Sequence, residues 1–177
     1  MVPKISFVRN ERRSLGYCAL RKGRVSILNA RYFITCCTVN RTSLLCENGI
    51  PAKLFDHFEK LGSKIDLVAL VRMPDHTHAV VRLIEGELAE FLCIYKSMSA
   101  REINSLLNRS GSVWQAGFFD RKFRGDEDLA PILFYMWNNP STPGKNFRCR
   151  KEEWLWLRSM VSEDMDYPEW LSNHPMG

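Results

Sequence analysis

Two histidines in this sequence have the spacing of a metal-binding pair. His76 and His78 stand in the run His-Thr-His-Ala-Val-Val-Arg-Leu, whose composition is typical of a β-strand. Because alternate residues of a strand point to the same side, the two imidazoles would project together. Neutral imidazoles are common metal ligands, so the pair could hold a divalent cation. The same pattern also fits two strand-surface histidines, or a core histidine beside an exposed one.

A tyrosine and an asparagine near the end of a predicted helix could complete such a site. Tyr135 and Asn139 are four positions apart and therefore share one helix face. A phenol can attack phosphorus, but its ordinary pKa of ~10 means that it needs activation, which a neighbouring metal would supply at the phosphate. Asn139 precedes Pro140, which disfavours helical geometry at the asparagine and could turn its amide oxygen inward as a third ligand. Alternatively, Tyr135 is an ordinary core aromatic and Asn139 an ordinary helix stop.

The elements that would position these residues alternate between strands and helices. Segments rich in β-branched and aromatic residues predict strands at 31–40, 65–72 and 76–83, with a further loop and strand in 113–123. Apolar residues at helical spacing predict helices at 50–61, 86–107 and 126–139. The short turn at 73–75 predicts a hairpin. This order favours an α+β fold, an antiparallel sheet with helices on one face.

Charge divides the chain into three parts. Residues 1–31 hold eight Lys or Arg against Glu11, whereas residues 152–177 hold six Asp or Glu against Arg158. We therefore expect a basic N-terminal arm (1–30), a catalytic domain (31–140) and an acidic C-terminal extension (141–177). The arm and the net charge of +5 suit a polyanionic partner. The tail either docks onto its own domain or competes with that partner for the basic residues of the domain.

Targeting signals are not evident in the sequence. The N-terminus lacks the apolar run of a signal peptide, and no apolar stretch is long enough to cross a bilayer, so we expect a cytoplasmic protein without a membrane partner. The six cysteines form no Cys-x-x-Cys pair, which weakens a structural zinc site.

Three separated blocks resemble the REP-associated tyrosine transposases, which belong to the HUH single-tyrosine transposases. The blocks are Met-Pro-Asp-His-Thr-His at 73–78, Trp-Gln at 114–115 with Phe-Phe-Asp-Arg at 118–121, and Tyr-Met-Trp-Asn-Asn-Pro at 135–140. They follow the family's order, and the similarity runs from about Tyr32 to Pro140. The chain departs from the family at Thr77, where a larger apolar residue is usual, and in the Ser-Thr-Pro-Gly-Lys that follows Pro140.

The resemblance implies a ferredoxin-like fold with the histidines on a central strand and the tyrosine on a helix facing them. It implies Mg²⁺ or Mn²⁺ held by His76, His78 and Asn139, with Asn138 as a competing ligand, and Tyr135 as nucleophile. Family members cleave single-stranded DNA beside hairpin-forming, REP-like palindromes. They leave a 5′-phosphotyrosine link and a free 3′-hydroxyl, then rejoin ends without ATP.

Basic residues outside the site predict how DNA would be held. Arg121, Lys122 and Arg124 follow Phe118 and Phe119, of which an exposed one could stack on an unpaired base. Further expected DNA contacts are Lys96, Trp114, Arg9, Arg12 and Arg13. Both phenylalanines could instead fill the core.

Two other functions compete with transposition. A hairpin-binding protein that has lost cleavage would keep the DNA contacts without the chemistry. A two-histidine phosphoesterase needs a second His-x-Thr or His-x-Ser motif, and neither His57 nor His174 stands in one. The sequence leaves monomer and homodimer open.

Overall fold

The computed structural model describes residues 25–47, 50–125, 127–139 and 155–157. The strands are β1 (Arg31–Cys37), β2 (Ile65–Met73), β3 (His76–Leu83), β4 (Phe119–Lys122) and β5 (Leu155–Leu157). The helices are η1 (Val39–Arg41), α2 (Ile50–Glu59), α3 (Leu88–Leu106) and α4 (Ala130–Asn138). Every element expected from the sequence is present, whereas η1 and β5 were not expected.

Two element boundaries differ from the expectation by three residues or more, for local reasons. β1 ends at Cys37 because the Thr38 hydroxyl donates to the carbonyls of Thr42 and Asp75, which draws the chain into the η1 turn. α4 begins at Ala130 rather than at residue 126. Its start is set by the Asp128 carboxylate, which accepts the Ala130 backbone N–H at 2.8 Å, and by the proline in the first turn.

The five strands form one sheet in the order β4-β1-β3-β2-β5, and all four pairings are antiparallel. The order of its first four strands, with α2 between β1 and β2 and α3 between β3 and β4, is the ferredoxin-like arrangement that was expected. β3 lies at the centre of the sheet, hydrogen-bonded on both sides. Residues on β3 are therefore held in fixed positions by two neighbouring strands.

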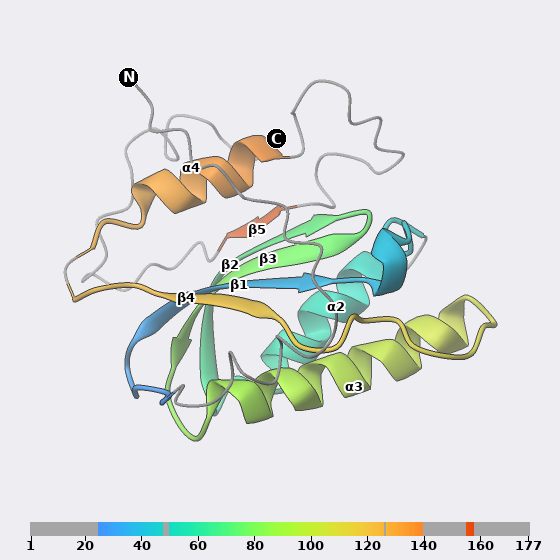
Figure 1. The fold of residues 1–177 in the computed structure, drawn as a ribbon, viewed down its shortest axis with the longest axis horizontal. Coiled ribbons are helices and arrows are strands. Elements are labelled where there is room, and N and C mark those ends of the chain that lie inside the picture. Colours follow the sequence, from blue (N-terminus) through green and yellow to red (C-terminus); the bar gives the residue numbers. More distant parts are fainter. Residues whose placement is uncertain (1–24, 48–49, 126, 140–154, 158–177) are drawn as a thin grey trace.

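The helices cover both faces of the sheet, and this corrects the expectation that they share one. α2 and α3 pack on one face over a core that includes Ile34, Val81 and Phe91. α4 lies across the opposite face, over a second core that includes Val80 and Met136 (Figure 1). The periodicity of a helix shows that it has an apolar side, but not which face of a sheet will cover that side.

The parts of the arm and of the extension that the structure describes both contact the expected catalytic domain. The Asn29 backbone N–H donates to the Leu83 carbonyl, and the Ser26 hydroxyl accepts the first backbone N–H of α3, from Leu88. β5, from the acidic extension, pairs with β2 and thereby adds a strand to the sheet. Among the described residues, no helix is long and apolar enough to cross a membrane.

Candidate active site

The two histidines lie side by side on the face of the sheet that α4 covers. His76 and His78 share this face with Val80, which belongs to the core beneath α4. Their ring centroids are 4.7 Å apart, and both residues are buried, at 7% and 4% exposure. The strand prediction for this pair is therefore confirmed, and the rings point toward the helix that carries Tyr135.

Each imidazole is oriented by a hydrogen bond at its Nδ1 atom. His76 Nδ1 lies 2.6 Å from Oδ1 of Asp75, and His78 Nδ1 lies 2.8 Å from Oγ1 of Thr35, its neighbour across the β1–β3 pair. Burial raises the pKa of Asp75, but the hydrogen bond with His76 and the nearby charge of Arg41 lower it by more. The pKa of Asp75 is therefore below its ordinary value, and the carboxylate stays ionised. Because Nδ1 of each ring is hydrogen-bonded, Nε2 is the nitrogen through which each imidazole would bind a metal.

Tyr135 stands over this pair. Its ring centroid lies 5.6 Å from that of His78 and 6.4 Å from that of Phe33, in an edge-to-face arrangement with Phe33. Phe33 also stacks on His78 at 5.1 Å, so one buried aromatic of β1 supports both rings. Tyr135 is half-buried at the border of the second core rather than enclosed in it. The phenol and the imidazoles thus belong to one site.

The environment of Tyr135 does not favour its ionised form in the absence of a cation. Burial raises the pKa of the phenol above its usual value, and the positive charge of Arg41 opposes that rise. The hydroxyl is therefore protonated at neutral pH. For this phenol to act as a nucleophile, a bound metal or a group of the substrate would have to activate it.

Asn139 is buried beside the tyrosine, although not for the reason expected. Its backbone is helical, with φ −56° and ψ −44°, so the expectation that Pro140 moves it out of helical geometry is wrong. Its side chain is only 6% exposed, and its Nδ2 donates to the Tyr135 hydroxyl at 3.5 Å. Asn138 lies outside the residues whose side chains are described.

In the described part of the chain no three His, Cys, Asp or Glu side chains gather as a metal site. The groups here that would suit a divalent cation are the two adjacent imidazoles and the amide of Asn139, which lies beside Tyr135. Such a set would leave positions open for phosphate oxygens and water, as a catalytic site requires.

Replacing Thr35 with valine tests the orientation of His78. The change keeps the strand-compatible shape but removes the hydroxyl that meets Nδ1. We expect Mn²⁺ affinity, measured by calorimetry on the free protein, to fall by ~10- to 100-fold, as is typical when the outer partner of a ligating histidine is lost. Thr42→Val, at an exposed hydroxyl outside the site, serves as the control. An affinity equal in both variants contradicts this role for Thr35.

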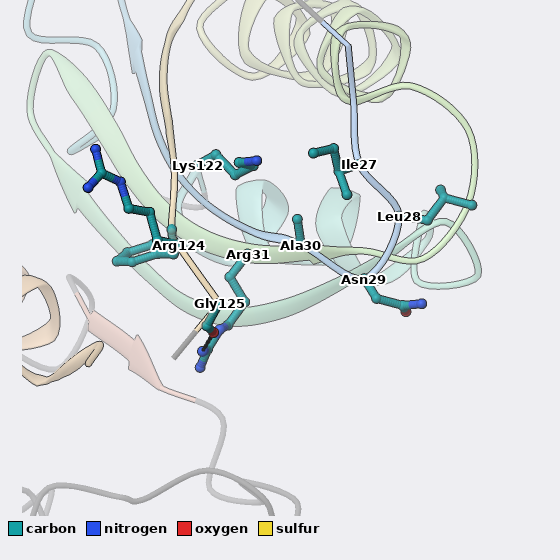
Figure 2. Close-up of a pocket in the computed structure, with 9 residues that line it drawn as sticks. Ile27, Leu28, Asn29, Ala30, Arg31, Lys122, Arg124 and Gly125 are labelled. Carbon is teal, nitrogen blue, oxygen red and sulfur yellow. Dashed lines mark hydrogen bonds between the residues drawn. The ribbon is translucent and has the colours of Figure 1, made fainter. Parts of the chain in front are cut away.

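The predicted DNA-binding residues of the β4 segment lie together at the edge of the sheet. Arg31, Lys122, Arg124 and Ile27 line a cleft of about 450 Å³ beside β4. Figure 2 shows Lys122 and Ile27 extending toward each other, and the hydrogen bond from Arg31 to the Gly125 carbonyl. Lys122 and Arg124 are exposed, and no described side chain forms an ion pair with either.

The other candidates for DNA contact differ in how accessible they are. Arg121 forms an ion pair with Glu127 and lies over the ring of Phe123 at 5.1 Å. Lys96 donates to the carbonyls of Gln115 and Gly117, and Trp114 is 7% exposed with its indole N–H donating to Ser99 Oγ. In this conformation Lys96 and Trp114 therefore hold the 114–117 loop on α3. The burial of Trp114 in the first core corrects its expected place on a DNA-binding surface, whereas the DNA contact of the partly exposed Lys96 stays a prediction.

Exposure also separates the two phenylalanines, while the arm residues cannot be placed. Phe119 is 49% exposed on β4, whereas Phe118 packs against the first core. Phe119 is thus the one available for stacking on a base. Arg9, Arg12 and Arg13 lie outside the described residues.

Sequence reasoning missed four residues of the site: Phe33, Thr35, Arg41 and Asp75. Asp75 stands directly before His76 in the family-like block, so its place in that block was a usable signal. Phe33 and Thr35 alternate on β1, and the register that sets Thr35 opposite His78 becomes visible only in the sheet.

Fold and site together define a class: an antiparallel α+β protein in which a His-x-His pair on the central strand faces a helical tyrosine. The chain belongs to the family of IS200-like transposases, whose model matches residues 26–138, more than half of its length. A Haemophilus influenzae (strain Rd) protein named "Putative REP-associated tyrosine transposase" is 29% identical over 90 residues, 45% of this chain and 51% of that protein. The chain therefore spans about half the length of this curated relative.

A solved structure has a similar fold. It is described as a REP-associated tyrosine transposase bound to a REP hairpin, and it superimposes with a TM-score of 0.57 at 21% identity. The match covers 74% of this chain and 77% of that one. At this identity the similarity shows the shared fold.

Proposed function

We propose that this protein cuts and rejoins single-stranded DNA through a covalent link to Tyr135, with Mg²⁺ or Mn²⁺ held by His76, His78 and Asn139. The observation that carries the proposal is the contact between the rings of Tyr135 and His78, whose centroids are 5.6 Å apart. Tyr135 is only half-buried there, so a substrate can reach it. Membership of a transposase family supports the same chemistry.

The reaction exchanges one phosphodiester for another. The Tyr135 oxygen attacks the phosphorus and the bond to O3′ breaks. The phenol loses its proton and O3′ takes one up, so the leaving strand ends in a 3′-hydroxyl. A 5′-phosphotyrosine remains, and attack by a second 3′-hydroxyl reverses the step. A bound cation would polarise the phosphate and disperse its charge. The chain's own contribution is to fix both imidazoles through Asp75 and Thr35 and to keep the hydroxyl within reach of Asn139.

The DNA partner is proposed to be a strand with a hairpin. The structural relative is described as bound to a REP hairpin, and the present chain shares its fold. The basic edge beside β4, formed by Arg31, Lys122 and Arg124, offers phosphate contacts, and the exposed ring of Phe119 on the same strand offers a base-stacking surface. These features suit a DNA strand that presents unpaired bases as well as its phosphates.

Labelled hairpin DNA tests the chemistry directly. The protein is incubated with Mn²⁺ and single strands that carry hairpin-forming repeats, and the products are separated under denaturing conditions. A 5′-phosphotyrosine predicts that a 3′ label migrates with the protein, whereas a 5′ label appears in a shorter free strand. Chelation by EDTA should remove both products. Absence of any adduct across a set of such hairpins contradicts the proposed function.

The salt dependence of binding tests the basic edge. We expect affinity for the hairpin strand to fall steeply with salt, because each neutralised phosphate releases counterions. Lys122→Ala should reduce the slope of log K against log[salt] by ~0.7 to 0.9, which is the contribution of one phosphate contact. Arg121→Ala should reduce it less, since Glu127 already pairs with that guanidinium. Fluorescence anisotropy at four salt concentrations measures both, and equal slopes in all three proteins contradict the assignment.

A further inference from the structure

The turn that follows β1 has an unusual backbone. Asn40 and Arg41 both have positive φ angles, of 53° and 56°. Asparagine tolerates this left-handed conformation, but a long side chain such as arginine seldom adopts it. An arginine kept where glycine would be less strained suggests that its side chain has a task at this position.

The Arg41 side chain is anchored to the same carboxylate that orients His76. Its Nε lies 2.9 Å from Oδ2 of Asp75, while Oδ1 of Asp75 lies 2.6 Å from His76 Nδ1. Its Nη1 donates to the sulfur of Cys37 at 2.9 Å. Asp75 therefore fixes the guanidinium at a set place relative to the histidine pair.

Part of the guanidinium faces outward from this anchor. The side chain is 50% exposed, and within the part of the chain that the structure describes Nη2 meets no acceptor. Asp75 contacts both Arg41 and His76, and the His76 ring lies beside the His78 ring that Tyr135 faces. A phosphate brought to Tyr135 would therefore approach the exposed part of this guanidinium.

We propose that Arg41 binds the DNA phosphate that Tyr135 attacks, with its Nη2 hydrogens donating to a non-bridging oxygen. Arginine suits this task because its planar fork of donors matches phosphate geometry. Asp75 holds the guanidinium at Nε, so Nη2 can donate to a phosphate. The inference rests on the proposed function, and it adds a substrate contact that neither histidine nor Asn139 supplies.

A neutral phosphate analogue separates this contact from a structural role. The cleavage step is blocked with Tyr135→Phe, so that only binding is measured. Hairpin strands are prepared with a single methylphosphonate at successive positions beside the hairpin. In a methylphosphonate, one charged oxygen is replaced by a methyl group. Dissociation constants are compared with and without Arg41→Ala in the same background. Arg101→Ala, at an exposed arginine of α3 on the other face, is the matched control.

The expected result is a coupling at one position. Arg41→Ala should weaken binding of the unmodified strand by about tenfold, and by less than about twofold when the methylphosphonate occupies the contacted position. Arg101→Ala should show no coupling at any position. An equal loss on every strand indicates that Arg41 only supports the turn and overturns the inference, as does the absence of any loss.

The two proposals fail separately. If intact protein forms no adduct but the coupling is found, the proposed cleavage fails and Arg41 remains a phosphate contact. If adducts form and no position shows coupling, this inference fails alone. Where both hold, the coupled position should be the phosphate that is cut.

Discussion

Replacing Tyr135 with phenylalanine should lower formation of the protein–DNA adduct by at least ~10³-fold, because the oxygen proposed to attack the phosphate is removed while the ring remains. The phenylalanine keeps the edge contact with Phe33 and the neighbourhood of His78. Affinity for the hairpin strand should stay within about twofold. Denaturing electrophoresis measures the adduct, and anisotropy measures binding on the same preparation.

Tyr95→Phe is the matched control for this variant. Tyr95 is fully buried on the opposite face, and its hydroxyl has no hydrogen-bond partner within the described residues, so its loss leaves no group unsatisfied. Adduct formation should be unchanged. An undiminished adduct in Tyr135→Phe would reveal a different nucleophile. Hairpin binding with no adduct even from the unchanged protein would favour a DNA-binding protein that has lost cleavage.

Replacing His78 with alanine should abolish cleavage and weaken Mn²⁺ binding by more than ~100-fold. The reason is that one of three proposed ligands is lost, an effect larger than the ~10- to 100-fold typical of an outer-shell partner. Titration of the free protein with Mn²⁺, followed by electron paramagnetic resonance, measures metal affinity without reference to activity. Thermal melting shows whether the variant still folds.

His57→Gln is the control for the loss of an imidazole. His57 is also buried, but on α2, which packs on the face of the sheet away from the site. Its replacement should leave Mn²⁺ affinity unchanged. If the two variants bind Mn²⁺ equally well, His78 is not a ligand. The metal assignment then has to be abandoned, whatever happens to cleavage.

Much of the scaffold could be predicted from local patterns. Alternation on one strand placed His76 and His78 on a common side, and the short turn before them predicted the hairpin with β2. Helical spacing found the helix of Tyr135. These features depend on neighbours within a few positions in the chain, and a single sequence carries that information directly.

The parts that could not be predicted depend on contacts between distant segments. Thr35 and His78 are 43 positions apart, and their pairing is set by sheet register. The face covered by α4 is set by how the whole chain folds. Trp114 illustrates the opposite error, since a motif position suggested DNA contact where the indole in fact packs in the core. Three-residue β5 lies in an acidic, tryptophan-containing segment with little strand signal.

The central place of β3 has a consequence for the proposed metal site. The strand that carries both imidazoles is secured by its ladders to β1 and β2 and by apolar cores above and below. We therefore expect the fold to persist when the proposed cation is removed, unlike that of a zinc finger, whose chain folds only around its ion. One ion of suitable size would then exchange for another while the polypeptide keeps its shape, so the choice of ion would be independent of the persistence of the native state.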